Sequence, residues 1–204
     1  MIRRRVAAAL IGILVSLLAA CSAGNATPTD SGRTGASSPF ATCPAPAASG
    51  TPSQPPSGPV GAAAGGRALP SVTLPCFTSG GGVDLARLGR PMVINFWAST
   101  CGPCRKEMPQ LQQFAAAVNG RLLVIGVDTA DSRDAAAAAG SDFGATYPVL
   151  FDPQSQLLSA WGRQVLPVTL FVDSSGIVRG EDMSGALTLA RLGDLADRYL
   201  GITS

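Results

Sequence analysis

The chain has 204 residues, of which 46% are hydrophobic and 14% charged, and its formal net charge is +2. This composition suits one globular domain with additional segments, and it excludes a nucleic-acid-binding protein or an acidic disordered chain. Because there is no histidine, the chain cannot use a histidine base, a histidine metal ligand or a Ser-His-Asp triad.

The N-terminus has the pattern of a targeting segment. Three arginines at residues 3–5 precede an apolar stretch of about 15 residues, and small residues lead up to Cys21. Since a membrane-spanning helix needs about 20 apolar residues, residues 1–20 are predicted to be a signal peptide. An uncleaved anchor and an ordinary secretory signal are the alternatives, and both place the rest of the chain outside the cytoplasm.

The sequence LAAC, residues 18–21, resembles a bacterial lipobox. The resemblance implies that Cys21 carries a lipid, becomes the mature N-terminus and anchors an extracytoplasmic protein to the cell membrane. Residues 21–67 are rich in Ala, Gly, Pro, Ser and Thr, a composition that cannot bury a core, and they are predicted to form a tether. Residues 68–204 are predicted to form the folded domain.

The pattern of the domain alternates between strand-like apolar runs and stretches with helical spacing. In chain order it predicts an edge strand at 71–75, a turn at 80–82, strands at 92–98 and 121–128, a helix at 132–144, a strand at 147–152, a short helix at 154–162, a strand pair at 168–173 and 177–183, and a final helix at 188–200. Another helix, kinked at Pro109, is predicted to follow Cys101. This order predicts an α/β fold in which helices flank both faces of a central mixed β-sheet.

Cys101 and Cys104 are separated only by Gly102 and Pro103 and follow a predicted buried strand. Structural zinc needs four ligands, and the other cysteines of this part of the chain lie far apart, so no metal site is predicted. A structural disulfide across two residues would constrain the unfolded chain very little. A redox-active pair is the use that is typical of a strand followed by Cys-x-x-Cys at a helix start.

The position of Cys101 favours a nucleophilic thiolate. Free backbone N–H groups and the positive end of the helix dipole lower the pKa of a thiol at a helix N-terminus. Cys104, one turn later, is predicted to be less exposed and to resolve the mixed disulfide. Trp97 is predicted either to line the rim where the substrate binds or to be an ordinary core residue.

The segment FWASTCGPC, followed by RKEMP, resembles the thioredoxin superfamily, and within it the extracytoplasmic ResA/TlpA/CcmG-like thiol-disulfide oxidoreductases. The resemblance covers roughly residues 69–200 and implies a thioredoxin-like fold that needs no cofactor. It also places Pro167, in VLPVT, in the cis-proline loop of the family, where the backbone of Leu166 binds the substrate's chain. A trans proline is the alternative, because only about 5–6% of X–Pro bonds in folded proteins are cis.

Two positions concern proton transfer. Cytoplasmic thioredoxins carry a buried aspartate in the strand before the cysteines, but the matching residue here is Asn95, which cannot transfer a proton. The ResA-like group has a glutamate three residues after its second cysteine, which matches Glu107. The resemblance implies that Glu107, with a pKa raised by burial, accepts the proton of Cys104. A solvent-facing glutamate beside Lys106 is the alternative.

Cys43 in the predicted tether and Cys76 after the first strand remain. Outside the cytoplasm disulfides persist, so these two cysteines are predicted to form a structural disulfide that pins the tether to the domain. A second redox pair is the competing interpretation, although neither cysteine lies at a predicted helix start.

Together these expectations describe a lipid-anchored enzyme whose Cys101–Cys104 dithiol reduces disulfides in other proteins. The Gly-Pro dipeptide between the cysteines is the one found in thioredoxin and favours the reducing direction. The resemblance implies a CcdA- or DsbD-like membrane electron donor. By analogy it also suggests apocytochrome c as a substrate, in cytochrome c maturation.

Three alternatives stay open. The first is a DsbA-like oxidase that runs the same chemistry in reverse. The second is a thiol peroxidase, although NFWASTCGPC lacks the proline and threonine of the usual peroxiredoxin pattern. The third is a binding lipoprotein that uses the fold as a scaffold around an inert disulfide, in which case Cys101 would not react with a thiol alkylator after mild reduction.

Overall fold

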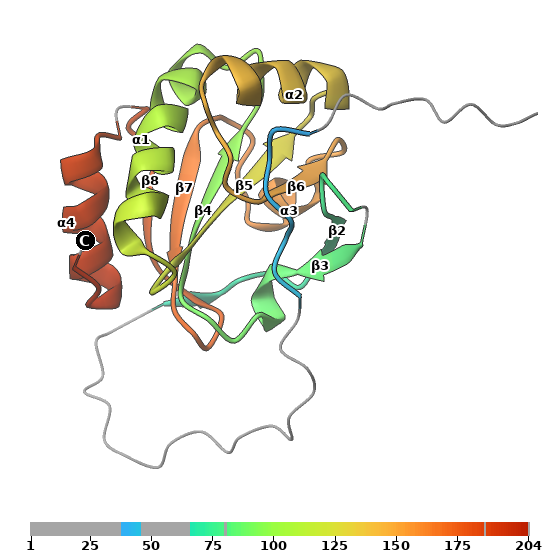
Figure 1. Ribbon diagram of the computed structural model, residues 1–204. Helices are drawn as coiled ribbons and strands as arrows, with labels where there is room; N and C mark the ends of the chain where they lie inside the picture. The colour runs from blue at the N-terminus through green and yellow to red at the C-terminus, as the bar shows by residue number, and fades with distance from the viewer. Residues whose placement is uncertain (1–37, 46–65, 80, 186, 204) are drawn as a thin grey trace, which may run out of the picture. The chain divides into compact units, whose positions relative to one another are not determined.

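The computed structural model describes residues 38–45, 66–79, 81–185 and 187–203 (Figure 1). The chain divides into two compact units, 1–34 and 35–204, and all described residues belong to the second. The predicted signal peptide, the lipidation site Cys21 and most of the predicted tether lie outside the described residues. No helix among the described residues is long and apolar enough to cross a membrane.

A six-stranded mixed sheet forms the centre of the domain, with the strand order β1-β8-β7-β4-β5-β6. Its strands are β1 (Arg67–Ala68), β4 (Met92–Trp97), β5 (Leu123–Thr129), β6 (Val149–Asp152), β7 (Val168–Val172) and β8 (Ile177–Asp182). Strands β4, β5 and β6 run parallel, while β7, β8 and β1 each run antiparallel to their inner neighbour. Every residue of β4 is buried, as expected of a central strand that is covered on both faces.

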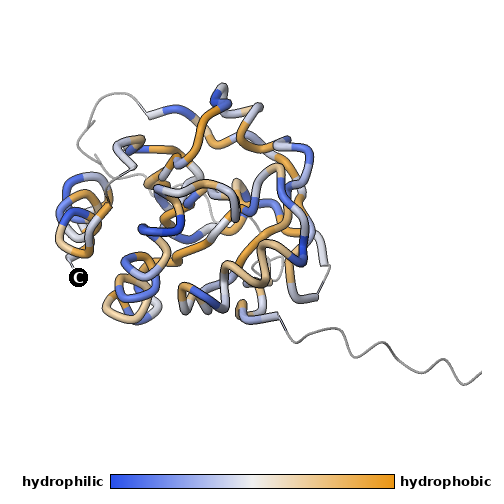
Figure 2. The backbone as a smooth tube through the Cα atoms, turned by 90° about the horizontal axis from the view of Figure 1, so that it is seen from above, coloured by the Kyte–Doolittle hydropathy of each residue, from blue (hydrophilic) through white to orange (hydrophobic). Residues whose placement is uncertain are grey.

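Helices cover both faces of the sheet, as the alternation in the sequence predicts. Three helices pack on one face, α1 (Gly102–Val118), α2 (Arg133–Asp142) and α4 (Leu189–Leu200), whereas α3 (Gln156–Ala160) and the 3-10 helix η1 (Leu85–Arg87) lie on the other. Along the helices in Figure 2, orange apolar stretches alternate with blue polar ones, the pattern of a helix with one buried side. Helix α1 continues through Pro109 without a break.

The strand predicted at 71–75 forms in a two-stranded ribbon that lies beside β6, an edge strand of the main sheet. β2 (Thr73–Pro75) pairs antiparallel with β3 (Gly82–Asp84) in a separate two-stranded sheet. Leu74 and Val83 of this ribbon are buried in the core on the α3 side. Cys76, directly after β2, forms an isolated antiparallel bridge with Leu150 of the edge strand β6, so the ribbon lies beside that edge while its apolar residues pack into the core.

Part of the predicted tether packs as part of the domain. Phe40 is 4% exposed and makes edge-on contacts with the rings of Phe77, at 4.9 Å between centroids, and Trp97, at 6.0 Å. The Ala41 N–H donates to the Thr146 carbonyl at 2.8 Å. Composition alone assigned residues 38–45 to the tether, but this segment is held on the domain by a large aromatic side chain, a backbone hydrogen bond and the disulfide of Cys43.

The packing of Phe40 on α2 generates a stability prediction. A methyl group added at Gly140 would lie 2.5 Å from Phe40 Cζ. An alanine inside a free helix is about 1 kcal/mol more favourable than glycine. We nevertheless expect Gly140→Ala to lower the free energy of unfolding, because it displaces Phe40.

Phe40→Ala alone should cost about 3 kcal/mol, and in that background the penalty of Gly140→Ala should shrink. Denaturant unfolding of the wild type, both single variants and the double variant, with disulfides intact, measures this coupling. Thr42→Ala, at an exposed position of the same segment, serves as the control and should be neutral. Strictly additive effects of Phe40→Ala and Gly140→Ala would contradict the contact.

Candidate active site

Cys101 and Cys104 form a disulfide where β4 passes into α1. Cys101 is the N-cap residue of α1, and its Sγ accepts a hydrogen bond from the Cys104 N–H at 3.2 Å. Cys104 is fully buried, whereas Cys101 is partly exposed. A partner molecule can therefore reach Cys101 and not Cys104, which is the asymmetry that attack and resolution by two different thiols require.

The turn before Cys101 is held from two sides. The Cys101 N–H donates to the Ala98 carbonyl at 3.0 Å and closes the turn. Within it, the Ser99 N–H donates to Asp131 Oδ2 at 2.5 Å, and the Ser132 N–H donates to the other oxygen of Asp131 at 2.8 Å. Since Asp131 belongs to the loop between β5 and α2, a carboxylate from a different element holds the turn.

Three segments meet beside the cysteines. The Leu166–Pro167 peptide bond is cis, the geometry that the resemblance implies. A Cβ added at Gly185, in the loop between β8 and α4, would lie 3.4 Å from Pro103 Cβ and 3.8 Å from Pro167 Cδ. Gly185 thus lies against both prolines, and Leu166 is partly exposed next to them.

Glu107 lies inside the domain, so the solvent-facing alternative does not hold. Its side chain is 1% exposed, one turn after Cys104 on α1, and its Oε1 accepts a hydrogen bond from the Leu187 N–H at 3.0 Å. Its Oε2 has no hydrogen-bond partner among the described residues. Burial raises the pKa of Glu107 above its usual value, and the hydrogen bond from Leu187 only partly opposes this rise.

A groove of about 410 Å³ lies beside Glu107. It is lined by Glu107 itself and by Lys106, Gln110, Gly185, Leu187 and Thr188. A buried acid that borders a groove can exchange its proton with water without any opening of the core.

Trp97 lies in the core, which corrects the expectation that it contacts the substrate. It is 0% exposed, and its ring packs against Phe40. The cause is the position of Trp97 as the last residue of a strand that is buried on both faces. Asn95, two residues earlier, is also buried and donates from Nδ2 to Thr169 Oγ1 at 2.9 Å.

A buried carboxyl near the site, that of Asp128, was not anticipated from the sequence. Asp128 is 0% exposed, pairs in register with Trp97, and has no donor to either oxygen among the described residues. Burial, aided by the negative charge of Asp131, raises the pKa of Asp128 to about 8. The sequence could have singled out Asp128 by its position, because this acid ends the apolar run RLLVIGVD. Ligand and catalytic groups gather at the C-terminal ends of parallel strands.

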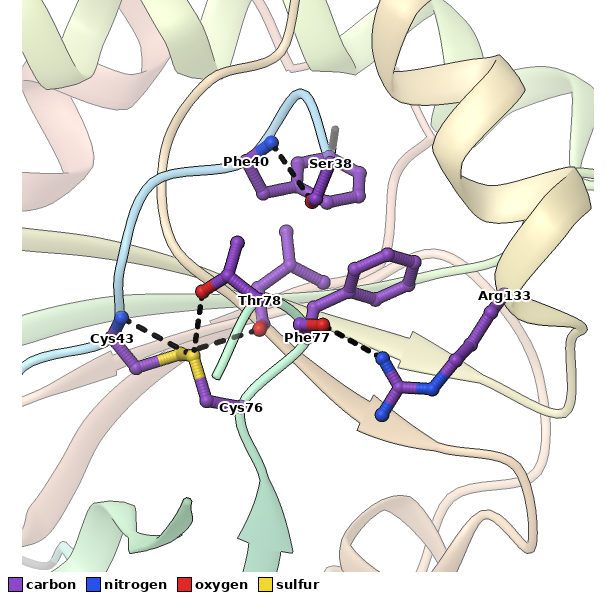
Figure 3. The surroundings of a disulfide bond; sticks show 8 residues. Ser38, Phe40, Cys43, Cys76, Phe77, Thr78 and Arg133 are labelled. Carbon is purple, nitrogen blue, oxygen red and sulfur yellow. Dashed lines mark hydrogen bonds between the residues drawn. A yellow bond between two sulfur atoms is a disulfide. The ribbon is translucent and has the colours of Figure 1, made fainter. Parts of the chain in front are cut away.

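The second disulfide joins Cys43 to Cys76, with 5.8 Å between their Cα atoms (Figure 3). Cys76 is 1% exposed, and its Sγ accepts a hydrogen bond from the Cys43 N–H at 3.2 Å. The Thr78 hydroxyl lies 3.3 Å from the same sulfur. Neither cysteine lies at a helix start, so this disulfide is built as a structural link between residues 38–45 and the end of β2.

Comparisons with known proteins were made for the whole chain. The sequence model of the AhpC/TSA family matches residues 66–181. Thiol-disulfide oxidoreductase ResA of Geobacillus thermodenitrificans is 29% identical over 101 residues, which are 49% of this chain and 58% of that protein. The thiol:disulfide interchange protein DsbE homolog of Paracoccus denitrificans is 40% identical over 119 residues, 54% of this chain and 62% of that protein. The chain therefore spans about three fifths of these curated relatives.

Solved structures share the same fold. A secreted disulfide oxidoreductase of Mycobacterium tuberculosis, homologous to Escherichia coli DsbE, aligns with a TM-score of 0.54 and 26% identity over 60% of this chain and 91% of that one. A DsbE thiol:disulfide interchange protein of Chlorobium tepidum aligns with a TM-score of 0.58 and 27% identity over 67% of this chain and 96% of that one. These likenesses confirm the predicted thioredoxin-like fold.

Proposed function

The chain belongs to the AhpC/TSA family, and on that premise we propose that it is an enzyme, a thiol-disulfide oxidoreductase that acts on other proteins through Cys101 and Cys104. The observation that carries the proposal is the asymmetry of the pair, with Cys101 partly exposed at the N-cap of α1 and Cys104 fully buried. The relatives named ResA and DsbE support the same chemistry.

The reaction begins with both cysteines reduced. The Cys101 thiolate attacks one sulfur of a substrate disulfide, so that a mixed disulfide forms and one substrate thiolate leaves. Cys104 then loses its proton and attacks Cys101 Sγ, which releases the second substrate thiolate and leaves Cys101–Cys104 oxidised. Two electrons pass from the enzyme's dithiol to the substrate.

Glu107 is the proposed acceptor of the Cys104 proton. The carboxyl is buried on the same side of α1 as Cys104, and one of its oxygens is free of hydrogen bonds among the described residues. Its raised pKa brings it closer to that of a thiol, which makes proton transfer between the two groups easier. The groove beside Glu107 then lets the proton leave to water.

We propose the reducing direction and a location outside the cytoplasm. Support for the direction is the Gly-Pro dipeptide, and support for the location is the LAAC sequence, which would make Cys21 a lipid-bearing N-terminus. The Cys43–Cys76 disulfide suits an oxidising compartment. Electrons would come from a CcdA- or DsbD-like membrane protein, and by analogy with the ResA/CcmG-like group the substrates would include the haem-binding cysteines of apocytochrome c.

The test of the function is a trapping experiment. Reduced Cys104→Ser chain, mixed with oxidised insulin, should accumulate a mixed disulfide that runs as a larger band on a non-reducing gel, because the resolving thiol is missing. Cys101→Ser should accumulate none. If neither variant traps insulin, or both trap it equally, the assigned roles are wrong.

The direction of the reaction is tested by measuring the reduction potential of the Cys101–Cys104 pair in equilibrium with glutathione. A value near thioredoxin's, about −270 mV, supports a reductant, whereas a value near DsbA's, about −120 mV, supports an oxidase.

Glu107→Gln tests the proton acceptor. Glutamine cannot accept a proton, so we expect release of the mixed disulfide to slow by about 100-fold while alkylation of Cys101 keeps nearly its wild-type rate. Single-turnover kinetics with a mixed disulfide to glutathione separates the two steps. Lys106→Gln, at an exposed neighbouring position, is the matched control and should keep the wild-type release rate. Equal release rates in all three proteins would remove Glu107 from the mechanism.

The anchor is tested on the N-terminus itself. The mature protein, expressed in a bacterium and recovered from membranes, should begin at Cys21 and carry the mass of a diacylglyceryl group. A Cys21→Ala chain should lack that mass and leave the membrane fraction. An intact N-terminus at Met1 in the membrane-bound wild type would instead indicate an uncleaved anchor.

A further inference from the structure

The turn that presents Cys101 depends on a pair of carboxyl groups that the proposed reaction does not use. We propose that Asp131 is a positioning residue for Cys101, acting through Ser99, and that a proton on Asp128 keeps Asp131 in place. The inference rests on the proposed function and adds to it a control of the nucleophile by a second loop.

Asp131 joins two loops that are distant in sequence. One of its oxygens accepts from the Ser99 N–H at 2.5 Å, inside the turn that ends at Cys101, and the other accepts from the Ser132 N–H at 2.8 Å, at the start of α2. Hydrogen bonds to an ionised carboxylate are stronger than neutral ones. Any displacement of Asp131 therefore moves the turn, and with it the sulfur at the N-cap of α1.

A proton on Asp128 would account for how Asp131 keeps its position. Asp128 is 0% exposed, and neither of its oxygens meets a donor among the described residues. Asp131 is close enough to act on it, and the negative charge of Asp131 favours a protonated Asp128. Two neighbouring carboxyl groups can hydrogen-bond to each other only when one of them carries a proton, because ionised carboxylates are acceptors only.

The other charged groups that face Asp128 are already engaged. Asp152 accepts the backbone N–H groups of Gln156 and Leu157 at the start of α3, and its negative charge adds to that of Asp131. Arg133 opposes them, but its guanidinium donates to the Phe77 carbonyl at 2.7 Å and lies over the rings of Phe77 and Phe151. The balance leaves Asp128 protonated at neutral pH.

A pH dependence follows from this arrangement. When Asp128 gives its proton to water near pH 8, a buried negative charge forms beside that of the half-buried Asp131. Their repulsion pushes Asp131 away from Ser99, and the turn before Cys101 loosens. Below that pH the shared proton holds the turn in the position described here.

The first test follows the Ser99 amide by NMR in the full chain, oxidised so that neither cysteine titrates. In the wild type, the Ser99 amide proton should lie far downfield at neutral pH and move upfield with a midpoint near pH 8. Asp128→Asn should stay downfield without titrating, and Asp131→Ala should be upfield throughout. Asp134→Asn removes an exposed charge from the same turn of α2 and should match the wild type.

The second test measures the nucleophile in the reduced chain. The alkylation rate of Cys101, divided by its thiolate fraction from absorbance in the same sample, should fall by about tenfold in Asp131→Ala. A merely structural role would lower the melting temperature and leave this rate unchanged. Asp128→Asn should fold well, because asparagine is neutral like the protonated aspartate. Between about pH 4 and 8 the folded wild type keeps a proton on Asp128 that the unfolded chain has released. The wild type therefore loses stability as pH rises through that range, and Asp128→Asn lacks this loss.

The outcomes separate the two proposals. If Asp131→Ala keeps the wild-type Ser99 shift and the wild-type rate per thiolate, the positioning role is wrong. A Ser99 shift that titrates equally in the wild type and in Asp128→Asn would remove Asp128 from the proposal. If Cys101 of the wild type does not react at all, the proposed function fails, whereas the NMR test of Asp131 still gives its own answer.

Discussion

The site depends on the abrupt change from strand to helix between Trp97 and Gly102. β4 is fixed because all six of its residues are buried, and α1 begins five residues after the strand ends, with Cys101 as its N-cap. The sulfur therefore lies where backbone N–H groups have no partner within the helix, and there it replaces a more usual oxygen cap. The cis-proline loop, the Gly185 loop and the Asp131 loop are each placed around this junction.

The same region holds most of the buried polar groups of the domain. Asn95, Thr169 and Asp182 stand opposite one another on β4, β7 and β8 and form a polar row across the sheet. Glu107 and Asp128 add two carboxyl groups with incomplete hydrogen bonding among the described residues. Such groups cost stability, and a core of purely apolar side chains would be more stable. Their concentration around one disulfide is what a site for proton and electron transfer needs.

Most of the architecture could be predicted because its signals are local. The apolar run of β4, the helical spacing after Cys101 and the turn SSG between β7 and β8 each specify one element, and each formed within a few residues of the expected bounds. What could not be predicted depends on contacts between distant segments. The apolar residues of β2 could not indicate that the strand would pair with β3 in a ribbon of its own. Phe40 could not show, from inside a low-complexity stretch, that it would meet Trp97.

The candidate site divides in the same way. The two cysteines and Pro167 stand in a continuous motif or at a fixed place in a known family, so sequence was sufficient to single them out. Trp97 was ambiguous because an aromatic residue next to a motif can equally lie at the rim of the site or in the core of the domain. Asp131 could not be singled out from the sequence, since its hydrogen bond to Ser99 spans 32 residues and joins two loops.

If the chain is anchored through a lipid on Cys21, as proposed, the docked segment would shorten the reach of the domain. Phe40 and Cys43 are fixed to the domain, so the chain first joins it there and not at β1. With a lipid on Cys21, the leash would be the stretch from there to Phe40, which spans at most about 65 Å, and not the stretch to Arg67, which could span roughly 160 Å. The volume that the active site can search above a membrane would shrink steeply with that radius, so its encounters would be confined to thiols held close to the bilayer.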